Sequence, residues 1–319
     1  MDYIDLHMHS TASDGTFSPA EVYNAALEIN LTAAALTDHD TVAGVEEFLN
    51  SAVDHPECEA VPGVEISCQL ADKEVHILGL FINHRSPELL KLLEFCREER
   101  RRRNRDIFLK LHFLGYDLDI CMPEFGGKLL DSIGRPHYAG ALVNRYGFPT
   151  LQSTFDKLLG YGKPAWVKRK YPLPEEVISA IHAAGGLAVW AHPILRDVPD
   201  KAFLMRSCRR LKAMGLDAIE GFYSMFSARE SALVAEAAEK YGLYLSGGSD
   251  FHGDNRPNVI PGFGAGGLRV PESLFFKLKE LKTMRLLNSA SPLLTNFMPD
   301  EDPSSSGNRC TDYFSTEKA

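Results

Sequence analysis

The chain has 319 residues, of which 45% are hydrophobic and 24% are charged, and its formal net charge is −9. This composition is ordinary for a globular protein and suits one large domain with insertions or two domains, while the acidic balance argues against a general nucleic-acid coat protein. The six cysteines form no CxxC pair, which favours a reducing, cytoplasmic setting, and the N-terminus has no signal-peptide pattern and no run of transmembrane length follows it.

The first predicted elements alternate between strands and helices. A strand through residues 4–9 is followed by Ser18, Pro19 and Glu21, which form the capping signature of a helix. A strand of small residues then leads into Asp38-His39-Asp40, and a helix is expected over 42–52. Apolar runs over 59–67 and 73–82 predict two strands joined by a hairpin through residues 71–73.

The pattern then changes to one long predicted helix over 88–115, which ends at Gly115. From Pro174 helices and strands alternate again, and repeated strand-helix units imply a parallel sheet. Closing that sheet into a barrel would place functional groups at the carboxyl ends of the strands. We therefore expect an α/β fold with barrel segments at 1–95 and 166–290, a helical cap inserted at 96–165 and a disordered polar tail at 291–319.

Potential metal ligands recur where the predicted strands end. Side chains two apart in a strand project to the same face, so His7 and His9 point together and can hold one ion, with Asp14 five residues further on. Imidazoles and carboxylates suit zinc, manganese or iron, and a carboxylate such as Glu65 can bridge two ions. The other candidates are Asp38, His39, Asp40, His76, His192, Asp250 and His252. No role is given to four isolated histidines, His55, His84, His112 and His182.

Six motifs carry a resemblance to a known family: "DLHMHSTASDGTFSP", "ALTDHDT", "PGVEIS", "VHILG", "AHP" and "GSDFH". From residue 2 to about residue 270 the chain resembles the PHP (polymerase and histidinol phosphatase) family, in its TrpH/YciV-like phosphoesterase branch. The resemblance implies a distorted (β/α)7 barrel and a cluster of three divalent ions, with manganese favoured and zinc or iron as alternatives. Asp38 and Asp40 flank a ligand and are expected to orient it or its loop instead of binding metal, as carboxylates around metal sites commonly do.

The resemblance implies a ligand set for each ion. One ion would be held by His7, His9, Glu65 and Asp250. Glu65 would bridge to a second ion, completed by His76 and His192, and the third would take Asp14, His39 and His252. Such a cluster makes hydroxide available at neutral pH for hydrolysis of a phosphate ester. The expected catalytic residues are therefore His7, His9, Glu65, His192 and Asp250.

Cationic residues outside the metal motifs are candidates for binding an anionic substrate. Arg135 and His137 stand at a predicted helix start, where a guanidinium and backbone donors can hold a phosphate. His137 is equally suited to cap that helix. Lys168 is our choice for a further substrate contact among the basic residues 168–170. The arginine-rich run 97–105 is interpreted as a solvated helix face, because its side chains spread around the axis and Glu98 and Glu99 dilute the charge.

The expected function is hydrolysis of the 3′-phosphate of nucleoside 3′,5′-bisphosphates, a reaction known in the resembling branch. The alternatives are 5′–3′ trimming of short 5′-phosphorylated RNA, a histidinol-phosphate type of phosphatase, and a non-catalytic nucleotide sensor. Phe222, Tyr223 and Phe226 are candidates to stack on a base, although core packing is the safer assumption for at least one of them. Neither a membrane nor an obligate protein partner is expected.

Overall fold

The computed structural model describes residues 2–127, 129–194 and 201–294. Residues 1–282 form one unit, to which the description below refers, and residues 283–319 form a second. The predicted tail begins inside the last helix, α9 (Glu272–Leu294), and its part from residue 295 onward lies outside the described residues. None of the helices in the described ranges is both long enough and apolar enough to cross a membrane.

Eight strands form one sheet in the order β7-β6-β5-β4-β3-β2-β1-β8. Beyond β7 the chain turns onto β1, where Asp250 N donates to His7 O at 2.8 Å and His9 N donates to Phe251 O at 2.9 Å. The barrel is therefore nearly closed, which confirms the predicted α/β barrel. The strands are β1 (Tyr3–Met8), β2 (Ala33–Leu36), β3 (Glu59–Leu70), β4 (Lys73–Leu80), β5 (Leu187–Trp190), β6 (Ala218–Tyr223), β7 (Tyr244–Gly248) and β8 (Val270–Pro271).

One barrel strand, β4, runs against its neighbours. It is joined to β3 by the predicted tight hairpin, in which Ala71 takes a positive φ of 59°, and it pairs antiparallel with both β3 and β5. A two-residue connection can join only antiparallel strands, so the predicted hairpin is confirmed, and the parallel pairing expected of the strand-helix units does not extend to this strand. The short β8 also pairs antiparallel, with β1.

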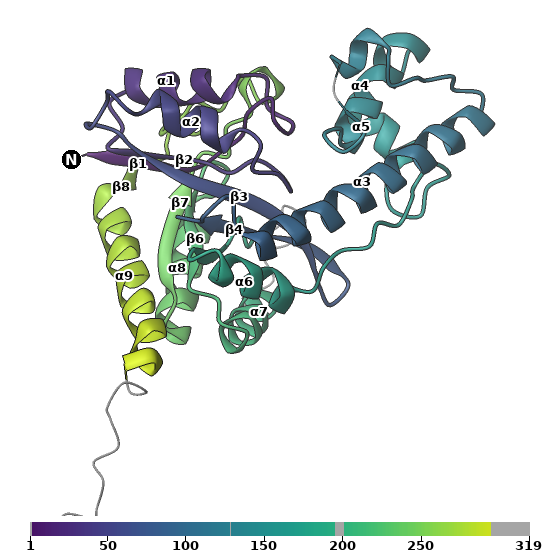
Figure 1. The fold of residues 1–319 in the computed structure, drawn as a ribbon. Coiled ribbons are helices and arrows are strands. Elements are labelled where there is room, and N and C mark those ends of the chain that lie inside the picture. Colours follow the sequence, from purple (N-terminus) through teal and green to yellow (C-terminus); the bar gives the residue numbers. More distant parts are fainter. Residues whose placement is uncertain (1, 128, 195–200, 295–319) are drawn as a thin grey trace, which may run out of the picture. The chain divides into compact units, whose positions relative to one another are not determined.

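Helices cover the strands, with α1 and α2 together beside β1 and β2 in Figure 1. The predicted capping of α1 is confirmed: Ser18 Oγ accepts from Glu21 N, and the Glu21 carboxylate accepts from Ser18 N. Three clusters of buried apolar side chains fill the barrel and its helical layer. The helices of the barrel part are α1 (Pro19–Glu28), α2 (Val45–Ser51), α6 (Pro174–Ala183), α7 (Lys201–Ala213), α8 (Ala228–Tyr241), the short η3 (Gly253–Asn255) and α9.

The inserted segment is helical and has a hydrophobic core of its own. The long helix α3 (Pro87–Phe113) contributes Leu89 and Leu93 to a barrel cluster and Ile107 and Leu111 to the cap core. It therefore joins the two cores and leads from the barrel to α4 and α5 (Figure 1). The predicted cap boundaries at 96 and 165 stay a prediction. The other cap elements are η1 (Pro123–Phe125), α4 (Arg135–Tyr146), α5 (Leu151–Thr154) and η2 (Phe155–Leu159).

The arginine-rich part of α3 is not simply a solvated face. Arg100 and Arg103 are only 8% and 6% exposed, and Asn104 is fully buried between them and the apolar residues that follow. These three positions continue the stripe of buried residues along α3 at helical spacing, so they face inward whatever their chemistry. The interpretation of residues 97–105 as a wet face is therefore wrong for this side of the helix.

Closure of the barrel depends on close approach between β7 and β1. A Cβ added at Gly248 would lie 2.5 Å from His7 N and closer still to His7 Cβ. We expect Gly248→Ala to lower the free energy of unfolding by about 1–3 kcal/mol, because the strands would have to separate. Chemical denaturation measures this. Gly140→Ala is the control, since its Cβ would meet nothing within 4 Å inside α4 and should stabilise slightly. Equal stabilities of Gly248→Ala and the wild type would contradict the close approach.

Candidate metal centre

Nine side chains predicted as metal ligands converge at one end of the barrel. Their donor atoms form four overlapping groups, and within each group the atoms lie within 4.8 Å of one another. Together the groups contain His7, His9, Asp14, His39, Glu65, His76, His192, Asp250 and His252. Asp38 and Asp40 belong to none of these groups, although they flank His39 in the sequence.

Glu65 lies at the middle of the cluster. Its Oε2 is 3.3 Å from His7 Nε2, 3.2 Å from His9 Nε2 and 3.0 Å from His39 Nδ1. Its Oε1 is 2.9 Å from His76 Nδ1 and 3.0 Å from His192 Nε2. One carboxylate oxygen therefore faces three imidazoles and the other faces two, which is the arrangement that a bridging carboxylate requires.

Two further carboxylates, those of Asp250 and Asp14, lie around Glu65. Asp250 Oδ1 is 3.2 Å from His9 Nε2 and 3.6 Å from His7 Nε2. Asp14 lies on the other side of the cluster, with its Oδ1 3.3 Å from His252 Nε2 and its Oδ2 3.9 Å from His39 Nε2. The four groups match the three expected ligand sets only in part, because His192 groups with His7 and Asp250, and His76 groups with His39 and Glu65. The division of the ligands among three ions therefore stays a prediction.

The donor atoms fit divalent cations. His7 Nε2, both ring nitrogens of His9, His39 Nδ1 and Glu65 Oε2 are buried, and the structure records no hydrogen bond for them within the described residues. Buried polar atoms are rarely left unpaired in proteins. Ligand atoms about 2.1 Å from one metal lie about 3.0–3.4 Å apart in octahedral or tetrahedral geometry, which is the range of most of the separations here.

The strands position these groups in two different ways. His7 lies near the end of β1, and His39 follows β2, as predicted for a barrel rim. Glu65 and His76, however, lie inside β3 and β4 and not at strand ends. The hairpin continues beyond the barrel rim, and its antiparallel register places Ser67 opposite His76, so that His76 is brought beside Glu65. The expectation that each ligand ends its own strand is therefore wrong for these two residues.

Charge in the cluster shifts the pKa values of its members. Burial alone lowers the pKa of His9 and of His76, but the neighbouring carboxylates outweigh it and raise these values to about 9 and about 10. His39 differs, because burial dominates and lowers its pKa to about 3. Burial opposes the charged form of Glu65, yet His39 and the other imidazoles hold its pKa well below the usual range. The protein without metal thus carries protons on imidazoles that metals would need in neutral form.

Two buried carboxylates that the sequence did not single out support the histidines. Glu220 Oε1 lies 3.0 Å from His7 Nδ1, and Glu220 Oε2 accepts from His192 N at 2.7 Å. Asp5 accepts from His7 N and Ser249 N, which ties β1 to the end of β7. Each carboxylate interrupts an otherwise apolar strand, and that interruption is the sequence signal that could have found it. A carboxylate on the second ring nitrogen orients a ligating histidine.

The carboxylates on either side of His39 have different partners. Asp38 accepts from Ser10 N, Ser10 Oγ and Ser13 Oγ, so it holds the loop that leads to Asp14. Asp40 accepts from two arginines of the inserted segment and its connection. Asp250 is held in turn by Tyr223 Oη, at 2.8 Å, and by the Arg256 guanidinium. Neither of these last two contacts was predicted.

Arg135 faces the same space as two of the histidines. A cavity of about 310 Å³ is lined by Arg135, His76 and His192, together with Trp190 and Phe203. A second cavity of about 400 Å³ shares Arg135 with the first and is lined also by Arg103, Lys168 and Tyr171. Arg135 is therefore shared by a cavity that reaches two histidines and by a second cavity whose lining has more cations than carboxylates, the latter being Asp72 and Glu74.

The structure shows where the other residues predicted to contact substrate lie, but it does not place them in the cavity beside His76 and His192. His137 Nδ1 accepts from Gly134 N at 3.0 Å, which is the capping alternative, and its contact with substrate stays a prediction. Lys168 is exposed and lines the second cavity, and its neighbour Arg169 lines the same cavity while its buried guanidinium pairs with Asp40. Phe222, Tyr223 and Phe226 line a further cavity of about 550 Å³, and their stacking on a base also stays a prediction.

The comparisons decide the family. The family description "PHP domain" matches residues 5–157. A 5′-3′ exoribonuclease from Haemophilus influenzae is 35% identical over 78% of this chain and 89% of its own length. The chain belongs to the PHP family. A 3′,5′-nucleoside bisphosphate phosphatase from Chromobacterium violaceum is 34% identical over 79% of this chain and 88% of its own length.

Solved structures agree with this assignment. An amidohydrolase from Chromobacterium violaceum, described with bound sulfate and no metal, superposes with a TM-score of 0.74 at 31% identity, covering 87% of this chain and 96% of that one. A protein described as a metal-dependent phosphoesterase from Bifidobacterium adolescentis gives 0.73 at 25% identity, covering 87% and 95%. The PHP assignment, the barrel fold and the expected class, a hydrolase of phosphoric esters, are confirmed.

Glu220 allows a test of whether the carboxylates that contact the histidines of this PHP centre support metal binding. We expect Glu220→Gln to weaken binding of divalent metal about 10–100-fold, because His7 and His192 lose the carboxylate that orients them. Titration with Mn²⁺ against a competing chelator measures the affinity. Asp217→Asn is a matched control, since Asp217 is also buried and binds a histidine ring nitrogen (His182) and a backbone N–H. An unchanged Mn²⁺ affinity in Glu220→Gln would contradict the role of Glu220 in orienting His7 and His192.

The raised pKa values predict that metal binding releases protons. His9 and His76 are protonated at pH 7, because their pKa values are about 9 and about 10, and only neutral imidazole binds metal. The affinity for Mn²⁺ should therefore rise as the pH rises from 7 toward 9. Calorimetric titrations in buffers of different ionisation enthalpy count the protons. His55→Gln, which removes an exposed histidine paired with Glu57, should leave the count unchanged. Binding without proton release at pH 7 would contradict the expectation.

Proposed function

We propose that the protein is a metal-dependent phosphatase that removes the 3′-phosphate from nucleoside 3′,5′-bisphosphates. The observation that supports this most directly is the shared cavity of Arg135, His76 and His192. A substrate with two phosphates can place one at the histidines and carboxylates and the other at the guanidinium. A related protein from Chromobacterium violaceum bears the name of this activity.

The proposed cofactor is a cluster of three divalent ions, with manganese favoured. His7, His9, Glu65 and Asp250 would hold one ion, Glu65 with His76 and His192 a second, and Asp14, His39 and His252 a third. When bound, such ions would neutralise charge on a phosphoryl group and would lower the pKa of a coordinated water molecule to a value near 7. The protein's own part is to fix these donors, which Glu220, Asp5 and Asp38 do through buried hydrogen bonds.

The cap supplies the charge that holds the second phosphate. Arg135 is the first residue of α4, and the backbone N–H groups of a helix start favour an anion. Arg103 lines the adjoining cavity, and its recorded hydrogen bonds within the described residues go only to the neutral Asn104 Oδ1. Burial and the neighbouring arginines lower the pKa of Arg103 to about 10. An anionic group in this cavity would offset that repulsion.

A second candidate function, 5′–3′ cleavage of short RNA, is favoured by the aromatic cavity. Tyr223 lines this cavity while its hydroxyl binds Asp250, so the cavity adjoins the metal centre. Phe222, Phe226 and Arg269 complete an apolar wall with one cation, which suits stacking of a base. The relative from Haemophilus influenzae bears the exoribonuclease name.

The substrate is tested by phosphate or nucleotide release from three compounds. Adenosine 3′,5′-bisphosphate should be hydrolysed faster than a 5′-phosphorylated dinucleotide, and histidinol phosphate should be hydrolysed slowest. The hydrolysis should require Mn²⁺ and should stop when the metal is removed with a chelator.

Arg135→Ala should raise KM for the bisphosphate about 10–100-fold, because a charge-assisted hydrogen bond to phosphate is lost. His9→Ala should remove turnover.

Arg145→Ala, at the opposite end of α4, lines neither cavity and serves as the control. Faster release from the dinucleotide would select the exoribonuclease function, and faster release from histidinol phosphate would select a different phosphatase. Tight bisphosphate binding without any release would select a nucleotide sensor. Unchanged KM in Arg135→Ala would remove that residue from the proposed site.

A further inference from the structure

A buried charge cluster joins the cap to the metal centre. Asp40 Oδ2 accepts from Arg100 Nη2 at 2.6 Å and from Arg169 Nη2 at 2.7 Å, and all three side chains are almost fully buried. Arg100 lies on α3, which enters the cap, and Arg169 lies on the segment that returns from it. We call these three residues the Asp40 clamp. Both chain connections of the cap are thus held by one carboxylate of the barrel.

The barrel end of the Asp40 clamp is fixed beside the central carboxylate. Asp40 N donates to Glu65 O at 2.8 Å, and Asp40 Oδ1 accepts from Ser67 N at 3.1 Å. Asp40 also has a positive φ of 54°, a backbone conformation that is uncommon outside glycine. The backbone N–H of Asp40 and its Oδ1 therefore form hydrogen bonds with β3 at Glu65 and Ser67, while its Oδ2 accepts from the two arginines.

The cap end of the Asp40 clamp leads to Arg135 by a short path. Asn104 lies one helical turn after Arg100 and donates through Nδ2 to Leu130 O and, at 2.9 Å, to Ile133 O. Asn104 O also accepts from Tyr138 Oη, on the first turns of α4, at 3.0 Å. The loop and the helix start that carry Arg135 are therefore fastened to α3 next to the clamp. Because a helix is stiff over one turn, the position of Arg100 sets that of Asn104.

We infer that the Asp40 clamp positions Arg135 relative to the metal centre and so determines the preference for substrates that carry a second phosphate. Asp40 and Arg100 line neither cavity and are positioning residues, whereas Arg169, the third member, also lines the second cavity. The inference rests on the proposed function, because it assigns to the clamp the selectivity that Arg135 provides there. The ribose limits the range of separations between the two phosphates of one nucleotide, so a displacement of Arg135 by about 1 Å would weaken binding of the second phosphate.

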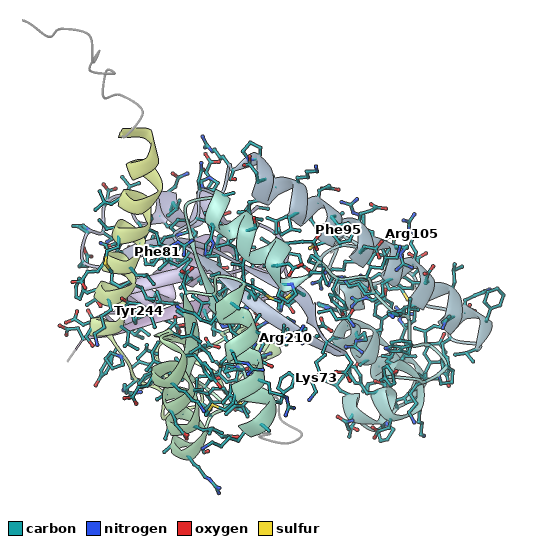
Figure 2. The ribbon with its side chains drawn as sticks, turned by 90° about the horizontal axis from the view of Figure 1, so that it is seen from below. Lys73, Phe81, Phe95, Arg105, Arg210 and Tyr244 are labelled. Atoms are coloured by element: carbon teal, nitrogen blue, oxygen red, sulfur yellow. The ribbon has the colours of Figure 1, made fainter. Side chains whose placement is uncertain are left out.

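Arg100→Met is the most informative variant. Arg169 still pairs with Asp40 in this variant, so no buried carboxylate is left alone and folding should be retained, whereas Asp40→Asn leaves two buried arginines without a charge partner. Arg105→Met is the matched control on the same helix: the Arg105 side chain is 58% exposed, lies 3.5 Å from Glu98, and sits farther along α3 than Phe95 (Figure 2). Thermal unfolding and circular dichroism check the fold of each variant.

The experiment compares kcat/KM for adenosine 3′,5′-bisphosphate with kcat/KM for adenosine 3′-monophosphate in the Mn²⁺-loaded enzyme. Arg100→Met should lower this ratio about tenfold, mainly through KM for the bisphosphate, and the double variant Arg100→Met/Arg135→Ala should be no lower than Arg135→Ala alone. Arg105→Met should keep the wild-type ratio. A merely structural loss would lower the activity toward both substrates together.

Binding of adenosine 5′-monophosphate, measured by calorimetry on the same metal-loaded proteins, gives a readout without turnover. Arg100→Met should weaken it by the same factor as the ratio. A folded Arg100→Met protein with the wild-type ratio and wild-type binding would overturn the inference. If the wild type does not hydrolyse the bisphosphate, the proposed function fails instead, and the binding measurement still shows whether the clamp positions Arg135.

Discussion

The placement of Glu65 is the constraint on which the rest of the structure depends. A fully buried carboxylate is costly unless it is paired, and here its two oxygens face five imidazole nitrogens from separate segments of the chain. In the protein without metal, protons on the imidazoles balance the buried carboxylates. A divalent ion that displaces two such protons leaves the total charge of the cluster the same. The protons on His9 and His76 therefore suffice for an exchange against one divalent ion, and further ions would make the cluster more positive.

The antiparallel strand β4 brings residues of the metal centre to a cavity that is also lined by Arg135 of the cap. A strand parallel to β3 would require a long crossover connection, and its residues would reach the rim only at the carboxyl end. The hairpin lets β3 and β4 continue past the rim together, so that Glu74, Val75 and His76 line the cavity that Arg135 also lines. His76 thus lies between two carboxylates, with Glu65 Oε1 2.9 Å from its Nδ1 and Glu74 Oε1 3.6 Å from its Nε2, in the cavity that Arg135 also lines.

Much of the site could be predicted because its signals are local. The spacing of His7 and His9 and the order of the six motifs located all nine side chains that the structure brings together. The Asp40 clamp could not be predicted in this way, because Asp40 is 60 residues from Arg100 and 129 from Arg169, and a charge pattern does not reveal a distant partner. One signal was overlooked: the apolar stripe of Leu89 and Leu93 continues at helical spacing through Arg100 to Ile107. An arginine in such a stripe is directed at a buried partner and not at solvent.

The charges near the cap bear on how an acidic protein would bind the doubly phosphorylated substrate that we propose. The net charge of −9 repels anions, but salt screens charges separated by more than about 8–10 Å, so the local environment decides binding. Asp40 neutralises part of the charge of Arg100 and Arg169, while Arg103 and Arg135 remain beside the cavities. Asp40 therefore pairs with the two arginines of the cap connections, one of which, Arg169, also lines the second cavity. Without Asp40 these buried arginines would repel one another, and the connections between cap and barrel would lose their shared ion pair.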